Sequence, residues 1–377
     1  MTILYVFRSL AIWGGIERVL VDKMNYLATI YGYDVYMITS DQGNHLIPYR
    51  LEKKVHFKDL GIRFHQQYQY KGFKRFKRFW VLKHLRALFE QRLAVQLGDI
   101  KPDVIVCTTA DYINVLVKLK GSIPLVVESH SICLRTIEYG KCWLFRKMYR
   151  FNYLRSLSKV DVLVSLTEGD AAEWRKVFHR VEVIPNIVHI NDADKKAPNS
   201  KHVIFVGRLD YQKRPMEIIR IWQRVYPKYP DWWLDIYGEG EQLNELQQVA
   251  CSLNMNIVIH PPTEHIFSCY CKCAFLVSSS LFEPFGLVLP EAMSCGLPVI
   301  AYDCPYGPSD IITNGHDGFL IEFDDIGAYV DKISHLMNSS DLRSQMGGNA
   351  INSSKRYAAQ NVMPRWKELF ERLSAKN

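Results

Sequence analysis

At 377 residues the chain is longer than one hydrophobic core usually organises, so two domains of ordinary size are expected. Apolar residues make up 48% of the sequence, which argues against an intrinsically disordered protein. Residues 1–190 hold 29 Lys and Arg against 17 Asp and Glu, a net charge of +12, whereas the remainder holds 18 against 22, a net charge of −4. The basic first half predicts an anionic partner, such as a membrane surface, a phosphorylated ligand or nucleic acid.

The first half alternates short apolar runs with stretches of helical spacing. The opening "TILYVF" is interpreted as a strand that leads through Gly14-Gly15 into a helix, rather than as a secretory leader. Further strands are expected at "DVYMITS", "DVIVCTT", "PLVVES" and "VDVLVSLT". This alternation is typical of a parallel sheet covered by helices on both faces. No apolar run approaches the ~20 residues that cross a bilayer.

A basic and aromatic stretch, "KGFKRFKRFWVLKHLRALFEQR", covers residues 71–92. On a helix, Phe73, Phe76, Trp80 and Ala87 fall on one side, and basic side chains spread over much of the rest. One interpretation is a helix that lies on anionic lipid through residues 71–86. The other is an ordinary domain helix whose long basic side chains cover apolar neighbours. The sequence leaves both open.

The polar stretch at 191–200 is interpreted as a linker to a second series of strands. These are expected at "HVIFVGR", "WLDIYGEG", "NIVIHPP", "AFLVSSS", "PVIAYD" and "GFLIEF". Two such series predict an α/β protein with two doubly wound, Rossmann-like domains, at 1–190 and 200–360. The amphipathic segment 361–377 is expected to form a helix that packs back across the junction.

Nine cysteines without a secretory leader favour reduced thiols in a cytoplasmic protein. Cys269, Cys271 and Cys273 form a C-x-C-x-C run, which is a weak indication of a metal site. No second cluster completes a zinc site and the run leads into a strand, so we expect ordinary thiols and no bound metal.

The stretch "FEPFGLVLPEA" holds two glutamates, Glu283 and Glu291, around a glycine turn that leads into a helix at about Leu287. The N–H groups of Gly286, Leu287 and Val288 would be free donors at the positive end of that helix, where a phosphate binds well. Carboxylates accept hydrogen bonds from adjacent hydroxyl pairs. A diphosphate between a sugar and a ribose would use all of these groups, so a nucleotide-sugar is predicted.

A basic pair lies on another loop at a strand end. "GRLDYQKRP" follows the strand "HVIFVGR" and holds Arg208 and Lys213. Two cations there would neutralise a departing diphosphate without a metal ion. No D-x-D triplet of the kind that holds a metal is present. The sequence therefore predicts neither a metal nor any other cofactor.

These motifs carry a family resemblance. "EPFGLVLPEA" followed by "GLPVIAYD", together with the G-R-x(4)-K spacing, resembles the E-x7-E region of retaining glycosyltransferases of family 4, which have the GT-B fold. The resemblance implies that Glu283 contacts the transferred sugar and Glu291 the ribose of the donor. It also implies that Arg208 and Lys213 bind the donor phosphates.

Weaker points of resemblance lie at other strand ends. Gly15 belongs to a G-G-x-E loop that meets donor phosphates or acceptor in the family, and His130 ends the strand of "PLVVESH", where a histidine often touches the sugar. Gly238 of "YGEGE" and Pro261 of "HPPTE" lie in segments that resemble those framing the nucleotide base. Neither segment distinguishes uracil from guanine.

The resulting hypothesis is a retaining hexosyltransferase that moves a sugar from a nucleotide-sugar, with UDP-sugar the expected donor, to a glycan or lipid-linked acceptor in surface polysaccharide synthesis. The first domain would be the acceptor side, and the enzyme would be cytoplasmic with peripheral contact to the inner face of the membrane. Alternatives are a nucleotide-sugar epimerase or phosphorylase of the same fold, or a non-catalytic module that binds membrane or nucleic acid. The last leaves the two glutamates unexplained, and no nucleic-acid partner is expected.

Overall fold

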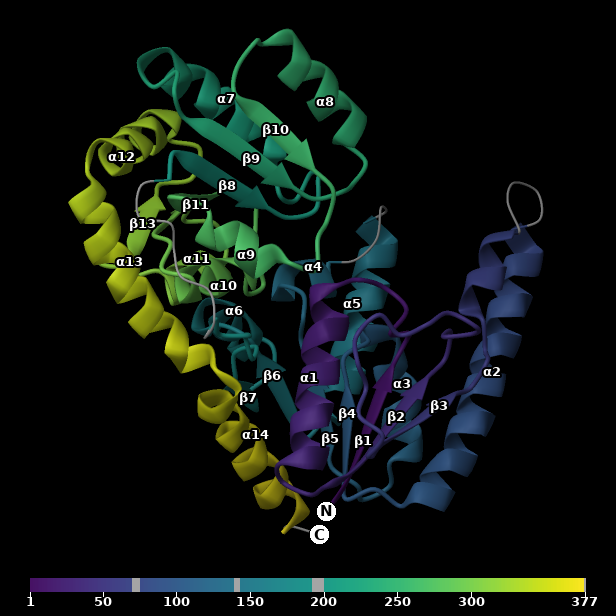
Figure 1. Cartoon of the computed structure of the whole chain (residues 1–377). Coiled ribbons are helices and arrows are strands. Elements are labelled where there is room, and N and C mark those ends of the chain that lie inside the picture. Colours follow the sequence, from purple (N-terminus) through teal and green to yellow (C-terminus); the bar gives the residue numbers. More distant parts are fainter. Residues whose placement is uncertain (70–74, 139–142, 192–199, 376–377) are drawn as a thin grey trace. The chain divides into compact units, whose positions relative to one another are not determined.

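A computed structural model describes residues 1–69, 75–138, 143–191 and 200–375 (Figure 1). The chain divides into two compact units. The first comprises residues 1–166, 171–187 and 363–377, and the second residues 167–170 and 188–362. Most of the expected linker, at 192–199, lies outside the described residues.

The first unit is built on a parallel sheet of seven strands in the order β3-β2-β1-β4-β5-β6-β7. Its strands are β1 (Thr2–Phe7), β2 (Asp34–Thr39), β3 (Val55–Asp59), β4 (Val104–Cys107), β5 (Leu125–Glu128), β6 (Val162–Ser165) and β7 (Val181–Val183). The five strands expected from apolar runs are present and lie inside the sheet. The two that were not expected, β3 and β7, form its edges, where "VHFKD" and "VEV" are only partly buried and need no continuous apolar run.

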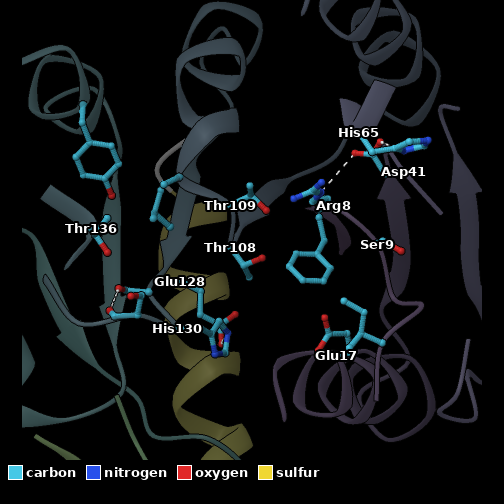
Figure 2. Close-up of a pocket in the computed structure, with 17 residues that line it drawn as sticks. Arg8, Ser9, Glu17, Asp41, His65, Thr108, Thr109, Glu128, His130 and Thr136 are labelled. Atoms are coloured by element: carbon cyan, nitrogen blue, oxygen red, sulfur yellow. Dashed lines mark hydrogen bonds and ion pairs between the residues drawn. The ribbon is translucent and has the colours of Figure 1, made fainter. Parts of the chain in front are cut away.

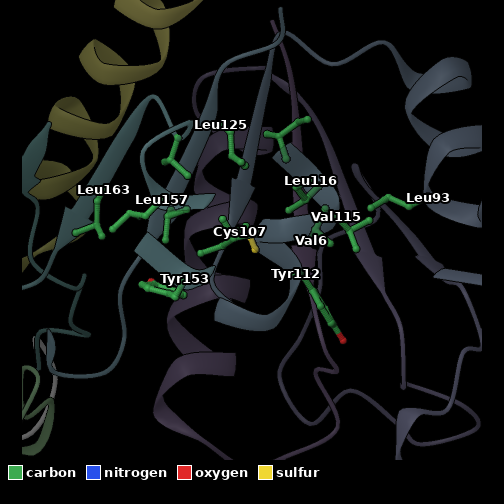
Figure 3. Packing of buried hydrophobic residues seen from close by; sticks show 14 of the residues in the cluster. Val6, Leu93, Cys107, Tyr112, Val115, Leu116, Leu125, Tyr153, Leu157 and Leu163 are labelled. Carbon is green, nitrogen blue, oxygen red and sulfur yellow. The ribbon is translucent and has the colours of Figure 1, made fainter. Parts of the chain in front are cut away.

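Helices cover the sheet of the first unit. They are α1 (Gly15–Thr29), α2 (Arg75–Ile100), α3 (Ile113–Leu119), α4 (Cys133–Ile137), α5 (Trp143–Leu157), α6 (Glu168–Arg175) and α14 (Ala359–Ser374). Leu93 of α2, Leu116 of α3 and Leu157 of α5 share one buried cluster with Val6 and Leu125 of the sheet (Figure 3). The three helices therefore pack on the same apolar core.

The basic helix α2 packs on the core with residues other than those that the sequence places together on one side. Leu85, Phe89, Leu93 and Leu97 are buried, whereas Trp80 and Ala87 are exposed. The interpretation as a domain helix is therefore confirmed for the part from 85 to 97. Of the other two residues expected on the apolar side, Phe73 lies outside the described residues, and the side chain of Phe76 is likewise not described.

The C-terminal helix α14 packs on the first unit through residues 363–375. Trp366 and Phe370 are buried, and the Trp366 ring centroid lies 4.0 Å from Lys23 Nζ. The Tyr33 hydroxyl donates to Glu371 at 3.1 Å. Apolar contacts and polar bonds together hold the last helix on the unit that begins the chain.

The second unit has a parallel sheet of six strands in the order β10-β9-β8-β11-β12-β13. The strands are β8 (His202–Val206), β9 (Trp233–Tyr237), β10 (Ile257–His260), β11 (Phe275–Ser278), β12 (Val299–Tyr302) and β13 (Gly318–Ile321). The helices are α7 (Pro215–Val225), α8 (Leu243–Ser252), α9 (Ile266–Cys271), α10 (Val288–Ser294), α11 (Gly307–Ile311), α12 (Ile326–Asn338) and α13 (Ser340–Ser354). All six expected strands are present, and the prediction of two doubly wound α/β units is confirmed.

Each sheet has one point at which the strand order reverses. In the first unit the chain runs outward from β1 to β3 and then returns to place β4 on the other side of β1. In the second unit it runs from β8 to β10 and returns to place β11 beside β8. Loops diverge at such a point and leave a crevice beyond the carboxyl ends of the strands, where ligands of this fold class bind.

Candidate active site

The loops beyond the carboxyl ends of β8 and β11 bring together Lys213 and Glu283, which are 70 residues apart in the sequence. Lys213 lies on the loop after β8 and Glu283 on the loop after β11, and these strands are neighbours. Lys213 Nζ forms an ion pair with Glu283 Oε1, and the two side chains are only 15% and 5% exposed. Because a partly buried charge is costly when it has no partner, each of the two depends on the other.

Glu283 is held firmly by its other neighbours. The Ser280 hydroxyl donates to Glu283 Oε1 at 2.6 Å. The backbone N–H groups of Tyr306 and Gly307 donate to the Glu283 carbonyl at 2.9 and 2.8 Å, and the Glu283 N–H donates to the Pro305 carbonyl at 2.6 Å. A carboxylate fixed in this way is preorganised and needs little rearrangement when a substrate arrives.

Arg208 lies on the same loop as Lys213 but in a different environment. Its side chain is 66% exposed, with Nη1 3.1 Å from Asp210 Oδ2 and Nη2 donating to Gln212 Oε1 at 3.0 Å. Asp210 Oδ1 also accepts a bond from the Lys213 N–H at 3.0 Å. The structure therefore places the predicted basic pair on one loop, with Lys213 turned to Glu283 and Arg208 open to solvent.

The glycine turn before α10 has the backbone that the sequence predicts. Gly286 has φ +94°, which strains any residue with a side chain, and α10 begins at Val288 directly after Leu287. The Leu289 N–H donates to the Gly286 carbonyl at 3.0 Å, so the donors that this turn offers are the preceding N–H groups of Gly286–Val288. Glu291 lies in the first turn of α10 and is buried, with 3% exposure.

The segments predicted to frame the nucleotide base lie at the ends of β9 and β10. A Cβ atom on Gly238 would lie 1.9 Å from the Gly207 carbonyl oxygen, so glycine is required there for two backbones to approach. The Tyr237 and His260 rings stack with centroids 4.3 Å apart, and Pro261 follows β10 at the surface. Contact between Gly238 or Pro261 and a base stays a prediction.

The first unit holds a pocket of about 570 Å³ beyond the carboxyl ends of β1, β4 and β5 (Figure 2). It is lined by Phe7, Arg8, Ser9, Ile12, Glu17, Asp41, His65, Thr108, Thr109, Ala110, Val127, Glu128, Ser129, His130, Ser131, Thr136 and Tyr153. The lining combines apolar walls with carboxylates, hydroxyls and one guanidinium. Such a mixture suits a ligand rich in hydroxyl groups.

The predicted His130 lines this pocket beside a buried ion pair. Lys23 Nζ donates to both carboxylate oxygens of Glu128, and both side chains are 1% exposed. His130 Nε2 lies 3.2 Å from Glu128 Oε1. A histidine next to a fixed carboxylate has its ring orientation defined, which suits a group that must meet a substrate.

The charge of Glu128 depends on its neighbours. Burial raises the pKa of this carboxyl, but the positive charge of Lys23 and the neighbouring His130 outweigh burial and lower it to about 2. Glu128 is therefore ionised at neutral pH even though it is buried.

We expect Glu128→Gln to lower the free energy of unfolding by about 3–5 kcal/mol, because it leaves the Lys23 charge buried without its partner. The double variant Lys23→Met/Glu128→Gln should recover much of this loss. As a control, Glu90→Gln removes the exposed Lys118–Glu90 pair and should cost no more than ~1 kcal/mol. Urea unfolding at neutral pH measures the free energy of unfolding of the three variants. Equal losses of stability in Glu128→Gln and Glu90→Gln would contradict the assignment of Lys23 and Glu128 as a buried ion pair.

The same pair predicts a pH dependence. Because the pKa of Glu128 is about 2 in the folded chain against an ordinary 4.5, its stabilisation is fully present above about pH 4.5 and declines as the pH falls toward 2. As the pH falls from about 4.5 toward 2, the wild type should therefore lose stability relative to the double variant Lys23→Met/Glu128→Gln.

The charged group Arg8, Asp41 and His65 in the pocket was not predicted from the sequence. Asp41 Oδ2 lies 3.6 Å from Arg8 Nε and Asp41 Oδ1 lies 3.7 Å from His65 Nδ1, and Figure 2 shows Arg8 and Asp41 facing one another. Ser40 also donates to Asp41 at 2.9 Å. The sequence could have indicated Arg8 and Asp41, because they directly follow the expected strands "TILYVF" and "DVYMITS" and ligands of this fold class bind at strand ends.

The G-G-x-E loop begins α1. Gly14 is the N-cap and Gly15 the first helical residue. Ile12 and Glu17 on either side line the pocket, and Gly15 is not among the described lining residues. Burial raises the pKa of Glu17. A donor contact for Gly15 stays a prediction.

Two family models match the chain. The model described as glycosyltransferase family 4 matches residues 13–192, and the model described as glycosyl transferases group 1 matches residues 189–353. The two matches meet near residue 190, so each unit corresponds to one model.

Curated relatives are glycosyltransferases or related enzymes of polysaccharide synthesis. An exopolysaccharide phosphotransferase of Streptomyces coelicolor is 30% identical over 222 residues, which are 57% of this chain and only 24% of that protein. An α-1,4-N-acetyl-D-galactosaminyltransferase of Campylobacter jejuni, named for a saccharide on PP-undecaprenol, is 26% identical over 362 residues, or 95% of each chain.

Solved structures share the fold. The crystal structure of TarM superposes with a TM-score of 0.80 at 17% identity and covers 98% of each chain. A mutant of TarM from S. aureus, in complex with fondaparinux, α-GlcNAc-glycerol and UDP, gives a TM-score of 0.78. With two matching family models and this fold, the chain is a glycosyltransferase of the hexosyltransferase type with the GT-B fold.

Proposed function

We propose that the enzyme transfers a hexosyl group from a UDP-sugar, with retention of anomeric configuration, to a glycan or lipid-linked acceptor in surface polysaccharide synthesis. The observation that carries the proposal is the largely buried Lys213–Glu283 pair between the loops after β8 and β11, on the same loop as the glycine turn of Gly286. A structural ion pair alone would not need an adjacent helix N-terminus, whose first N–H groups are suited to bind an anion.

In the proposed complex the donor lies in the crevice of the second unit. Arg208, Lys213 and the turn N–H groups of Gly286–Val288 bind the diphosphate, and Glu291 accepts the ribose hydroxyls. Glu283 accepts hydroxyls of the transferred sugar. UDP is the expected nucleotide because the S. aureus TarM complex, which has the same fold, contains UDP.

The proposed chemistry uses only these side chains and the N–H groups of the turn. The bond between the anomeric carbon and the β-phosphate oxygen breaks while the acceptor hydroxyl oxygen bonds to the same face of that carbon. The hydroxyl proton passes to the departing phosphate oxygen. Positive charge from Arg208 and Lys213 stabilises the diphosphate as it leaves.

The acceptor side is proposed to lie in the first unit. The pocket lined by His130 offers hydroxyls and carboxylates to a saccharide, and His130 is proposed to contact the transferred sugar as the family resemblance implies. The Campylobacter relative is named for an acceptor linked to PP-undecaprenol, which supports a lipid-linked saccharide here. The epimerase, phosphorylase and non-catalytic alternatives have no observation in their favour.

A lipid-linked acceptor would require contact with the cytoplasmic face of the membrane. Within the described ranges, no helix is long and apolar enough to cross a bilayer. The proposed contact through residues 71–86 rests on Phe79 and Trp80, which are both 65% exposed at the start of α2, because the residues before 75 lie outside the described part.

Donor hydrolysis tests the proposed function most simply. The purified enzyme is incubated with a panel of UDP- and GDP-sugars without acceptor, and free sugar is measured. Slow release from one UDP-sugar, in the anomeric form of the donor, would support the proposal and name the sugar. Release from none of the panel, or release with inverted configuration, would contradict it.

We further expect the hydrolysis rate to be unchanged by EDTA, because two cationic side chains supply the charge that a metal ion supplies elsewhere. The measurement is the rate with and without EDTA after dialysis, with added Mg²⁺ as the reverse control. A loss of activity in EDTA that Mg²⁺ restores would overturn this expectation.

A further inference from the structure

Helix α5 is apolar on two opposite faces. Tyr153 and Leu157 are buried in the core of the first unit. On the other side, Leu144, Met148 and Phe151 follow the i, i+4, i+7 spacing of one helix face and are exposed to solvent. An apolar helix face is normally packed against another element, and within the described ranges nothing covers this outer face of α5.

The exposure is large and concentrated. Five large apolar side chains of α5, namely Trp143, Leu144, Phe145, Met148 and Phe151, are between 54% and 66% exposed. Monomeric soluble proteins rarely expose contiguous apolar patches beyond a few hundred Å² unless the patch binds something. We call these five residues, with Arg146, Lys147 and Arg150, the α5 surface.

The charge of the α5 surface indicates what covers it. Arg146, Lys147 and Arg150 are exposed, and residues 143–160 include no Asp or Glu. Two copies of this chain that met through α5 would bring like charges together. A surface of anionic headgroups above an apolar layer complements both the cations and the apolar face.

The position of α5 supports the same partner. In a parallel sheet each connecting helix begins at the carboxyl ends of the strands, so α2 and α5 begin at the same end of the first unit, as Figure 1 shows. Exposed Phe79 and Trp80 lie near the start of α2. The pocket opens at that end too, and Tyr153 of α5 is part of its lining.

We propose that the α5 surface binds the anionic headgroup layer of a lipid bilayer, with its apolar side chains in the headgroup boundary and its cations on lipid phosphates. This extends the proposed membrane contact, which rested on α2, and rests on the proposed function only in placing the pocket near a lipid-linked acceptor. Helix α5 then both binds the membrane and carries a wall of the pocket.

The test is sedimentation of the full chain with vesicles of phosphatidylcholine that contain phosphatidylglycerol, beside vesicles of phosphatidylcholine alone. The wild type should bind the anionic vesicles and release them as salt rises. Lys147→Ser/Arg150→Ser should lower the partition coefficient roughly 30-fold at low salt, and Met148→Ser/Phe151→Ser at least about 100-fold.

Two control variants make the same kinds of substitution, of cations and of apolar side chains, at the other end of the first unit. Lys53→Ser/Lys54→Ser removes two exposed cations just before β3, and Ile30→Ser/Val95→Ser removes two exposed apolar side chains. Both should bind vesicles like the wild type. Thermal unfolding verifies that all variants fold, and donor hydrolysis should be unchanged in the α5 variants.

The outcomes separate the alternatives. Loss of binding in the α5 variants alone, or together with a Phe79→Ser/Trp80→Ser variant, supports the proposal. Loss only in the α2 variant overturns it and leaves the contact at 71–86. No binding by the wild type, or a dimer in light scattering that the α5 variants dissociate, overturns it as well. Failure of the proposed function would instead appear as absent donor hydrolysis in the wild type.

Discussion

Arg208→Ala is expected to lower the rate of glycosyl transfer about 100-fold or more while it changes the free energy of unfolding by less than ~0.5 kcal/mol. The guanidinium is 66% exposed and bonds only to Asp210 and Gln212 among the described residues, and exposed pairs of this kind contribute little to stability. Its proposed role is to stabilise charge on the departing diphosphate, where one lost contact corresponds to ~2.7–4 kcal/mol.

Arg220→Ala is the matched control. Arg220 is also 66% exposed and pairs with Glu217 at 3.3 Å, but it lies on α7 rather than on the loop after β8. Transfer rates at saturating donor, measured beside urea unfolding, should separate the two variants. Near-normal transfer by Arg208→Ala, or an equal loss in Arg220→Ala, would remove Arg208 from the donor site.

Lys213→Met should also lower transfer about 100-fold or more, but with a cost in stability that Arg208→Ala lacks. Without Lys213, the buried Glu283 carboxylate keeps only the Ser280 hydroxyl as a side-chain donor among the described contacts. The double variant Lys213→Met/Glu283→Gln should regain stability and remain inactive. Recovery of transfer in the double variant would show that Lys213 acts only by neutralising Glu283.

The central strands of both sheets could be predicted because burial on both faces leaves a continuous apolar run in the sequence. The edge strand β3 could not, since its residues His56, Phe57 and Lys58 face solvent and impose no such pattern. The buried face of a helix is likewise hard to predict from the sequence alone. In α2 the apolar spacing around Trp80 suggested one face, while packing against the core selected the face of Phe89.

The candidate site was predictable where a glycine turn or a basic pair marks a strand end. The contact between Lys213 and Glu283 was not, because it depends on β8 and β11 being neighbours, and strand order leaves no local pattern in the sequence. Asp41 was missed because its loop has no recognised motif. The α5 surface was missed because exposure, rather than composition, distinguishes it from an ordinary buried helix.

The two buried glutamates should fail in different ways when each is changed to glutamine. Glu291→Gln keeps the shape but weakens the acceptor of the ribose hydroxyls, and hydrogen bonds to charged groups contribute ~1.5–3 kcal/mol. UDP alone should therefore bind about 10- to 100-fold more weakly. Glu283→Gln should leave UDP binding nearly unchanged, because UDP lacks the sugar, and should nevertheless abolish transfer. Glu368→Gln, an exposed change on α14, is the control.

Calorimetry of UDP binding to these variants, set beside their transfer rates, tests most directly whether the second unit holds the donor as proposed. The account predicts reduced UDP affinity in Glu291→Gln alone and loss of transfer in Glu283→Gln with UDP affinity retained. Equal losses of UDP affinity in the two variants, or no loss in either, would contradict the assignment of Glu283 to the sugar and Glu291 to the ribose.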